Sequence, residues 1–125
     1  MTSSSTLPLI GVPTSITQMP GSQFFAYTSG KRYIASINEF SNFLAVQIPS
    51  LGDGYDYADL VSRFDGIMLT GGRANVEPHH YDGPPFPEDE AIDPERDATV
   101  LRIVPACIEA GVPILGICRG LQEMN

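Results

Sequence analysis

Residues 112–125, VPILGICRGLQEMN, decide how the rest of the sequence is interpreted. A short apolar run leads into Cys118, which has one glycine two positions before it and another two positions after it. The residues that follow the cysteine favour the start of a helix. A strand that turns at once into a helix through such a segment is typical of layered α/β proteins.

Three earlier segments have the same apolar character as the run at 112–117. They are LPLIGV (7–12), LAVQIP (44–49) and GIMLTGG (66–72). None of them alternates between polar and apolar residues, so each favours a strand that is buried on both faces. We therefore predict an α/β fold in which a parallel sheet is covered by helices on both faces.

Helical spacing of apolar residues connects these strands. It predicts helices over 31–40, 56–64 and 93–111, the last two of which begin with an aspartate at the capping position. Pro105 lies inside the last helix, where it removes a hydrogen bond, so we expect a kink or a local break there. The predicted order is β-α-β-α-β-loop-α-β-α, with a polar loop after the first strand.

Composition narrows the class of protein. The chain has 125 residues, 42% of them apolar, which suits one small domain with a core. We expect residues 1–6 to be a disordered tail and 7–125 to form the domain. The net charge is −8 without any cluster of Lys or Arg, which argues against nucleic acid and anionic membranes as partners.

Cellular location is also constrained by the sequence. No apolar run approaches the roughly 18 residues that a membrane span requires, and the N-terminus has neither a signal peptide nor a transit peptide pattern. A secreted disulfide scaffold would hold more than the two cysteines found here. We therefore expect a cytoplasmic protein with reduced thiols.

Two glycine-bearing turns hold the candidate chemistry. The segment around Cys118 has the form of a nucleophile elbow, known better with serine as G-x-S-x-G. A helix N-terminus favours the thiolate, and the backbone N–H of Arg119 would point at a developing oxyanion. Gly72 is the candidate for a second oxyanion donor, because its backbone can approach a substrate closely, and Gly71 would shape that turn.

Less specific interpretations remain open for these residues. A cysteine at the end of a strand can be a small core residue, and a double glycine can be a tight turn without function. Cys107, on the apolar face of a helix, is expected to be a core residue. The double glycine does not match the dinucleotide fingerprint, and no phosphate-binding loop is present, so no cofactor is expected.

The long loop after residue 72 contains both histidines of the chain. We expect His79 and His80 to be surface residues, with a role as the base partner of Cys118 kept as an alternative. The segment EPHH lacks a workable ligand spacing, so no metal site is predicted. The acidic run at 87–97 is expected to be a solvated loop and helix start.

The segment GICRGLQEMN resembles the nucleophile segment of the class I glutamine amidotransferase-like superfamily, whose pattern is G-[IVL]-C-x-G-x-Q. Together with DGIMLTGGRANVEPHHY and DPERD, it is similar to the γ-glutamyl-γ-aminobutyrate hydrolase family, of peptidase C26 type. The resemblance implies a flavodoxin-like core. It also implies a Cys118 nucleophile, oxyanion donors at Gly72 and Arg119, and substrate contacts at Gly71 and Gln122.

This resemblance carries an expectation about the size of the functional protein. In that family a cysteine, a histidine and a glutamate form the catalytic triad, and the last two lie well downstream of the cysteine. Seven residues follow Cys118 here, so we expect the chain to be the N-terminal part of such a domain. The expected activity is hydrolysis of a small-molecule γ-glutamyl amide through a γ-glutamyl thioester.

Two alternatives to that activity remain. The chain could be the glutaminase domain of an amidotransferase that hands ammonia to a synthase partner. It could also be a truncated, non-catalytic fragment that lacks the triad His and Glu. The sequence leaves the amine half of the substrate and the oligomeric state unassigned.

Overall fold

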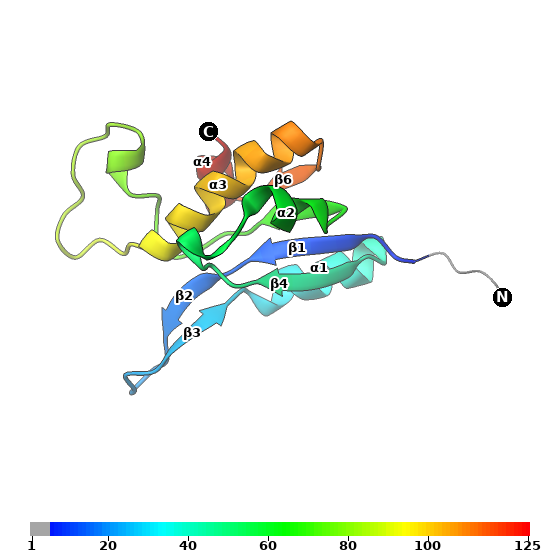
Figure 1. Cartoon of the computed structure of the whole chain (residues 1–125). Helices are drawn as coiled ribbons and strands as arrows, with labels where there is room; N and C mark the ends of the chain where they lie inside the picture. Colours follow the sequence, from blue (N-terminus) through cyan, green and yellow to red (C-terminus); the bar gives the residue numbers. More distant parts are fainter. Residues whose placement is uncertain (1–5) are drawn as a thin grey trace.

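A parallel sheet of four strands forms the centre of the fold, in the order β4-β1-β5-β6 (Figure 1). The computed structural model describes residues 6–125, so all but the last residue of the expected disordered tail lies outside the described part. The strands are β1 (Leu9–Pro13), β2 (Ser15–Gln18), β3 (Phe25–Thr28), β4 (Leu44–Ile48), β5 (Gly66–Leu69) and β6 (Ile114–Gly116). The helices are α1 (Lys31–Ser41), α2 (Tyr57–Ser62), α3 (Pro94–Ala110) and α4 (Arg119–Met124), with short 3-10 turns η1 (Gly52–Gly54) and η2 (Pro78–His80).

Helices cover both faces of this sheet, as the continuous apolar strands predicted. On one face α1 packs against β1 and β5 through Ile37, Val12 and Met68. On the other face α2 and α3 enclose the larger apolar cluster, made of Ile48, Val61, Ile67, Leu69, Val100, Ile103, Val104 and Cys107. All four residues of β5 are buried. The α/β class and its flavodoxin-like character are thereby confirmed.

A hairpin of two strands was missed by the sequence analysis. In place of the expected polar loop after β1, β2 and β3 pair antiparallel, with Ser15 opposite Thr28 and Gln18 opposite Phe25. Both strands are short and largely exposed, so they lack the apolar runs that identified the central strands. The hairpin extends away from the end of the sheet beneath α3 (Figure 1).

The helix ends agree with the sequence, whereas the break expected at Pro105 is not found. Asp56 and Asp93 cap α2 and α3 by accepting backbone N–H bonds of 3.1 Å and 3.2 Å. α3 is one helix throughout residues 94–110 with Pro105 inside it. Pro105 lies on the exposed side, and the opposite face is held in the core, so tertiary packing offsets the missing hydrogen bond.

A buried network of four charged side chains joins α3 to α4. Arg96 donates two hydrogen bonds of 3.0 Å to the carboxylate of Glu123. Arg119 donates to Glu123 at 3.2 Å and to Asp97. These four residues are at most 4% exposed, and their two positive and two negative charges balance. The expectation that residues 87–97 are fully solvated is therefore wrong at its helical end.

The network also holds the loops at the carboxyl end of the sheet. Arg96 donates to the backbone oxygen of Thr70 at 2.6 Å and to the hydroxyl of Ser15 at 2.8 Å. Arg119 donates to the backbone oxygen of Ala74 at 2.7 Å. Buried carbonyl groups that would otherwise lack partners are satisfied in this way.

We expect Glu123→Gln to destabilise the fold strongly. The substitution leaves two buried guanidinium groups facing one carboxylate, and breaking a buried pair costs about 3–5 kcal/mol. Urea unfolding should show this loss, whereas Glu109→Gln, the same change at an exposed position on α3, should stay within about 0.5 kcal/mol of the parent. Equal stability of the two variants would contradict a structural role for the network.

Candidate functional site

The candidate nucleophile lies at the turn between β6 and α4. Cys118 is exposed, and its backbone has φ 52° and ψ −109°. A non-glycine residue with positive φ is strained by roughly 1–3 kcal/mol, and such strain is concentrated at functional sites. The residue that precedes α4 is thereby held with its side chain accessible, as a nucleophile elbow requires.

The glycines on either side of Cys118 are required by close packing. A Cβ at Gly120 would lie 2.4 Å from the backbone oxygen of Leu69, at the end of β5. A Cβ at Gly116 would lie 2.8 Å from the backbone of Gly120. The turn therefore folds tightly against the neighbouring strand, and any larger residue at these positions would push it away.

The second glycine-bearing turn lies beside the cysteine, as the parallel sheet predicted. An ideal Cβ at Gly71 would be 3.6 Å from the Cβ of Cys118. The backbone N–H of Gly71 donates to the hydroxyl of Tyr33 at 3.1 Å, which fixes the turn to α1. Gly72 packs over the ion network, because a Cβ there would meet the Arg96 guanidinium at 3.0 Å and the Arg119 side chain at 3.2 Å.

The backbone donors expected for an oxyanion hole are available. Arg119 is the first residue of α4, and the first N–H groups of a helix have no partner within the helix. Among residues 6–125, no hydrogen bond occupies the N–H of Gly72. The side chain of Arg119 is buried in the network, so its backbone position is rigid.

Gln122 lies on α4, one turn from the cysteine, and holds the loop that follows the double glycine. Its Oε1 accepts the N–H of Val76 at 3.4 Å, and its Nε2 donates to Oδ1 of Asn75 at 3.0 Å. The side chain therefore fixes the loop rather than pointing freely into a cavity. The sequence motif identified the residue but not this contact.

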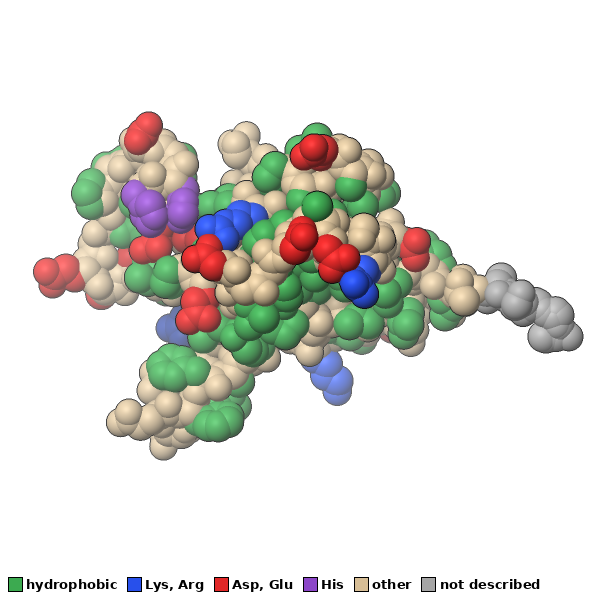
Figure 2. Space-filling model, viewed as in Figure 1, with side chains coloured by type: hydrophobic (Ala, Val, Ile, Leu, Met, Phe, Trp, Pro, Cys, Tyr) green, Lys and Arg blue, Asp and Glu red, His purple; other side chains and the backbone are tan. Residues whose placement is uncertain are grey.

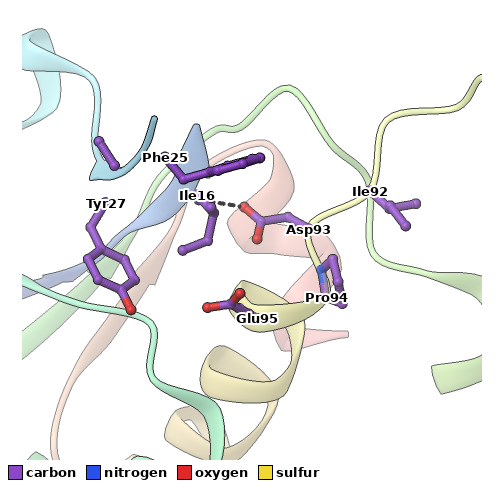
Figure 3. Close-up of a pocket in the computed structure, with 8 residues that line it drawn as sticks. Ile16, Phe25, Tyr27, Ile92, Asp93, Pro94 and Glu95 are labelled. Atoms are coloured by element: carbon purple, nitrogen blue, oxygen red, sulfur yellow. Dashed lines mark hydrogen bonds between the residues drawn. The ribbon is translucent and has the colours of Figure 1, made fainter. Parts of the chain in front are cut away.

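Two neighbouring cavities lie between the hairpin and the start of α3. One, of about 570 Å³, is lined by the Gly71–Gly72 turn, Arg73 and polar residues of β2 and β3. The other, of about 530 Å³, has the aromatic side chains of Phe25 and Tyr27 on one side and Glu95 at its base (Figure 3).

The two cavities share three residues, Ile16, Ile92 and Asp93. The N–H of Ile16 donates to Asp93 at 3.0 Å, and this bond ties the hairpin to the start of α3 (Figure 3). The hairpin that the sequence analysis missed is therefore a wall of both cavities. The aromatic and β-branched residues of SIT and FFAYT were the available signal.

The two cysteines have different environments. Cys107 is fully buried against the large apolar cluster, which fits its expected place in the core. Burial raises the pKa of the Cys107 thiol to about 11, so this residue remains a thiol at neutral pH. Cys118, in contrast, is exposed at the start of α4.

The histidines lie together on η2, away from any hydrogen bond to Cys118 within residues 6–125. Both are exposed, as expected. Nε2 of His80 is 3.8 Å from Oδ2 of the buried Asp97. The ligand atoms of Glu77, His79 and His80 lie within 4.8 Å of one another, closer than the sequence spacing of EPHH indicated.

Membrane spans are not found among the helices that the structure describes, since none is both long enough and apolar enough to cross a bilayer.

Comparisons with known proteins agree on one family. Residues 8–125 match the Peptidase C26 family. The γ-glutamyl-γ-aminobutyrate hydrolase PuuD of Escherichia coli K12 is 35% identical over 118 residues, which cover 94% of this chain and 44% of the relative. The putative glutamine amidotransferase-like protein YvdE of Lactococcus lactis is 48% identical over 61 residues, or 49% of this chain and 25% of the relative.

A putative glutamine amidotransferase-like protein of Rickettsia prowazekii is 37% identical over 67 residues, or 53% of this chain and 24% of the relative. This chain thus spans less than half the length of these curated relatives. The family match covers nearly every residue, including both glycine-bearing turns and α4. The chain therefore belongs to the Peptidase C26 family.

Proposed function

We propose that this chain carries the nucleophile of a cysteine-dependent hydrolase of γ-glutamyl amide bonds and works as part of a longer polypeptide. The observation that carries the proposal is the exposed Cys118 at positive φ, placed against the Gly71–Gly72 turn. The similarity to γ-glutamyl-γ-aminobutyrate hydrolase gives the class of bond that is cleaved.

The proposed reaction begins when the Cys118 thiolate attacks the γ-carbonyl carbon of the substrate. A carbon–sulfur bond forms, and the carbonyl electron pair moves to the oxygen, which accepts hydrogen bonds from the N–H groups of Gly72 and Arg119. When the carbonyl re-forms, the carbon–nitrogen bond breaks and the amine leaves with a proton. Water then attacks the thioester, which releases glutamate and restores the thiol.

We assign proton transfer in this scheme to the histidine and the glutamate that the family resemblance implies downstream of the cysteine. The exposure of Cys118 suits contact with such residues. A positioned base of this kind contributes a factor of roughly 10²–10⁴ to such reactions. We therefore assign the 125 residues the nucleophile and the oxyanion donors, and assign the proton shuttle to the longer chain.

Recognition of the glutamyl group is assigned to the polar cavity beside the double glycine. Arg73 lines this cavity, and a guanidinium binds a carboxylate through two parallel hydrogen bonds. Hydroxyl groups of Ser15, Thr17 and Thr28 lie on the same cavity. These groups suit the charged α-amino-acid end of a γ-glutamyl substrate.

A second candidate is a glutaminase domain that supplies ammonia to a synthase. The 48% identity over 61 residues to a protein named as a putative glutamine amidotransferase-like protein supports this candidate. The first bond cleaved would be the same, but the substrate would be free glutamine. Turnover of glutamine that depends on a partner protein would support this candidate over the hydrolase.

We expect a thiol reagent such as iodoacetamide to modify one cysteine of the chain. Cys118 is exposed at a helix start, whereas Cys107 is buried with a raised pKa. Mass spectrometry of the folded protein near pH 7 should show a single adduct, absent from Cys118→Ser. Adducts on both cysteines of the folded protein at equal rates would contradict these assignments.

In the longer protein that contains this chain, Cys118→Ala should abolish hydrolysis of γ-glutamyl amides. Loss of a covalent nucleophile lowers kcat by roughly 10⁴–10⁶-fold. Cys107→Ala is the matched control. It removes one sulfur atom from the core and leaves the Cys118 turn unchanged, so turnover should be retained. Turnover that survives in Cys118→Ala would remove the cysteine from the mechanism.

Arg73→Gln in the same protein should raise KM for γ-glutamyl substrates by roughly tenfold, with kcat less affected, because a charge-assisted contact to bound substrate is lost. Arg63→Gln provides the control, since Arg63 pairs with Asp59 on the surface of α2. Steady-state kinetics on both variants separates the two effects. An unchanged KM in Arg73→Gln would place the substrate carboxylate elsewhere.

A further inference from the structure

We propose that Glu77, His79 and His80 bind one divalent transition-metal ion of the Zn²⁺ type. Each residue offers one ligand atom, and these atoms lie within 4.8 Å of one another. A tetrahedral zinc ion with bonds of about 2.1 Å needs ligand atoms about 3.4 Å apart. Small side-chain rotations are needed to close that difference, and both histidines are exposed residues.

The types of ligand select the ion. Two imidazole nitrogens and one carboxylate oxygen form a donor set used by zinc in proteins, with a fourth position left for water. Calcium and magnesium prefer oxygen donors, so two histidines argue against them. The proposed ligand set therefore fits Zn²⁺ and its neighbours Co²⁺ and Ni²⁺.

Local backbone structure holds the three ligands in place. Glu77 precedes η2, and its carbonyl oxygen accepts the N–H of His80 at 3.2 Å. Pro78 begins η2 and accepts the N–H of Gly83 at 2.9 Å through its carbonyl oxygen. The imidazole rings of the two histidines lie with their centroids 4.0 Å apart. The turn therefore presents both rings to the same side.

A second observation points to the same ion. Histidine ligands of metals usually donate their other ring N–H to a carboxylate. Nε2 of His80 is 3.8 Å from Oδ2 of Asp97, whose side chain is fully buried. That carboxylate is fixed by Arg119 and by the N–H of Glu77 at 3.1 Å. Because Nε2 of His80 is the ring nitrogen near Asp97, the proposed site uses Nδ1 of His80 as the metal ligand.

The surrounding charge favours a cation at this place. Figure 2 shows the two histidines side by side on the surface, with acidic side chains below them and a basic group to one side. The whole chain has a net charge of −8. The two nearest arginines of the network are buried and already paired with carboxylates, so they oppose an ion at the surface only weakly.

Isothermal titration calorimetry with ZnCl₂ tests the proposal on the tag-free longer protein that contains this chain. The titration uses a Cys118→Ser background, because an exposed thiolate is itself a zinc ligand. We expect one Zn²⁺ per chain, with His79→Ala and His80→Ala each weakening affinity by at least tenfold. Glu88→Gln, which removes an exposed acid from the same loop, is the matched control and should leave affinity unchanged.

Cobalt provides an independent readout, because tetrahedral Co²⁺ absorbs visible light strongly and octahedral aqueous Co²⁺ does so weakly. We expect this absorption to appear with the Cys118→Ser chain and to be lost in His79→Ala. Equal zinc affinity in the parent, His79→Ala and His80→Ala would overturn the proposal, as would the absence of saturable binding. The readout needs no substrate, so failure of the proposed hydrolase leaves this test intact.

Discussion

The candidate site depends on one interaction, the buried network in which Arg96 and Arg119 share the carboxylates of Glu123 and Asp97. Taking these charges out of water is costly, and only complete pairing makes the arrangement tolerable. All of these charges are paired only when α3, α4 and the loop after β5 pack together in one arrangement. A network that is satisfied only in the native arrangement favours that arrangement over other packings of the same helices.

This requirement explains why the turn at Cys118 holds an unfavourable backbone conformation. Arg119 follows the cysteine directly, and its side chain is anchored below the sheet end by Asp97 and the carbonyl of Ala74. On the other side, Gly120 packs against the backbone of Leu69. The cysteine is thus followed by two fixed residues, and the strain at its φ angle is offset by contacts that its own side chain does not make.

The sequence predicted those parts of the structure that depend on short-range patterns. The strands at the centre of the sheet, the capping aspartates and the Gly-x-Cys-x-Gly turn are each specified within a few residues. The ion network could not be predicted in that way, because its partners on α3 and α4 are 22 to 27 residues apart in sequence. Aspartate is usually exposed to solvent, and Asp97 is buried because α4 packs against α3.

Two further features of the structure were not predicted. Proline breaks a helix where only local hydrogen bonds hold it, but α3 continues past Pro105 because its apolar face packs on the sheet. The 3-10 turn at Pro78 brings the ligand atoms of Glu77, His79 and His80 within 4.8 Å of one another, and no pattern in the sequence indicated this turn.

The hairpin of β2 and β3 is held to the rest of the fold by fewer contacts than the strands of the central sheet. An isolated two-stranded ribbon is marginally stable in water, and this one is tied to α3 through the Asp93 carboxylate. The elbow and its glycines pack instead against β5 of the central sheet. The hairpin can open at lower free energy, as local unfolding units do. The Arg96 guanidinium also holds the hairpin, through the hydroxyl of Ser15 at 2.8 Å. The wall that the hairpin gives to both cavities is therefore positioned by the first turn of α3.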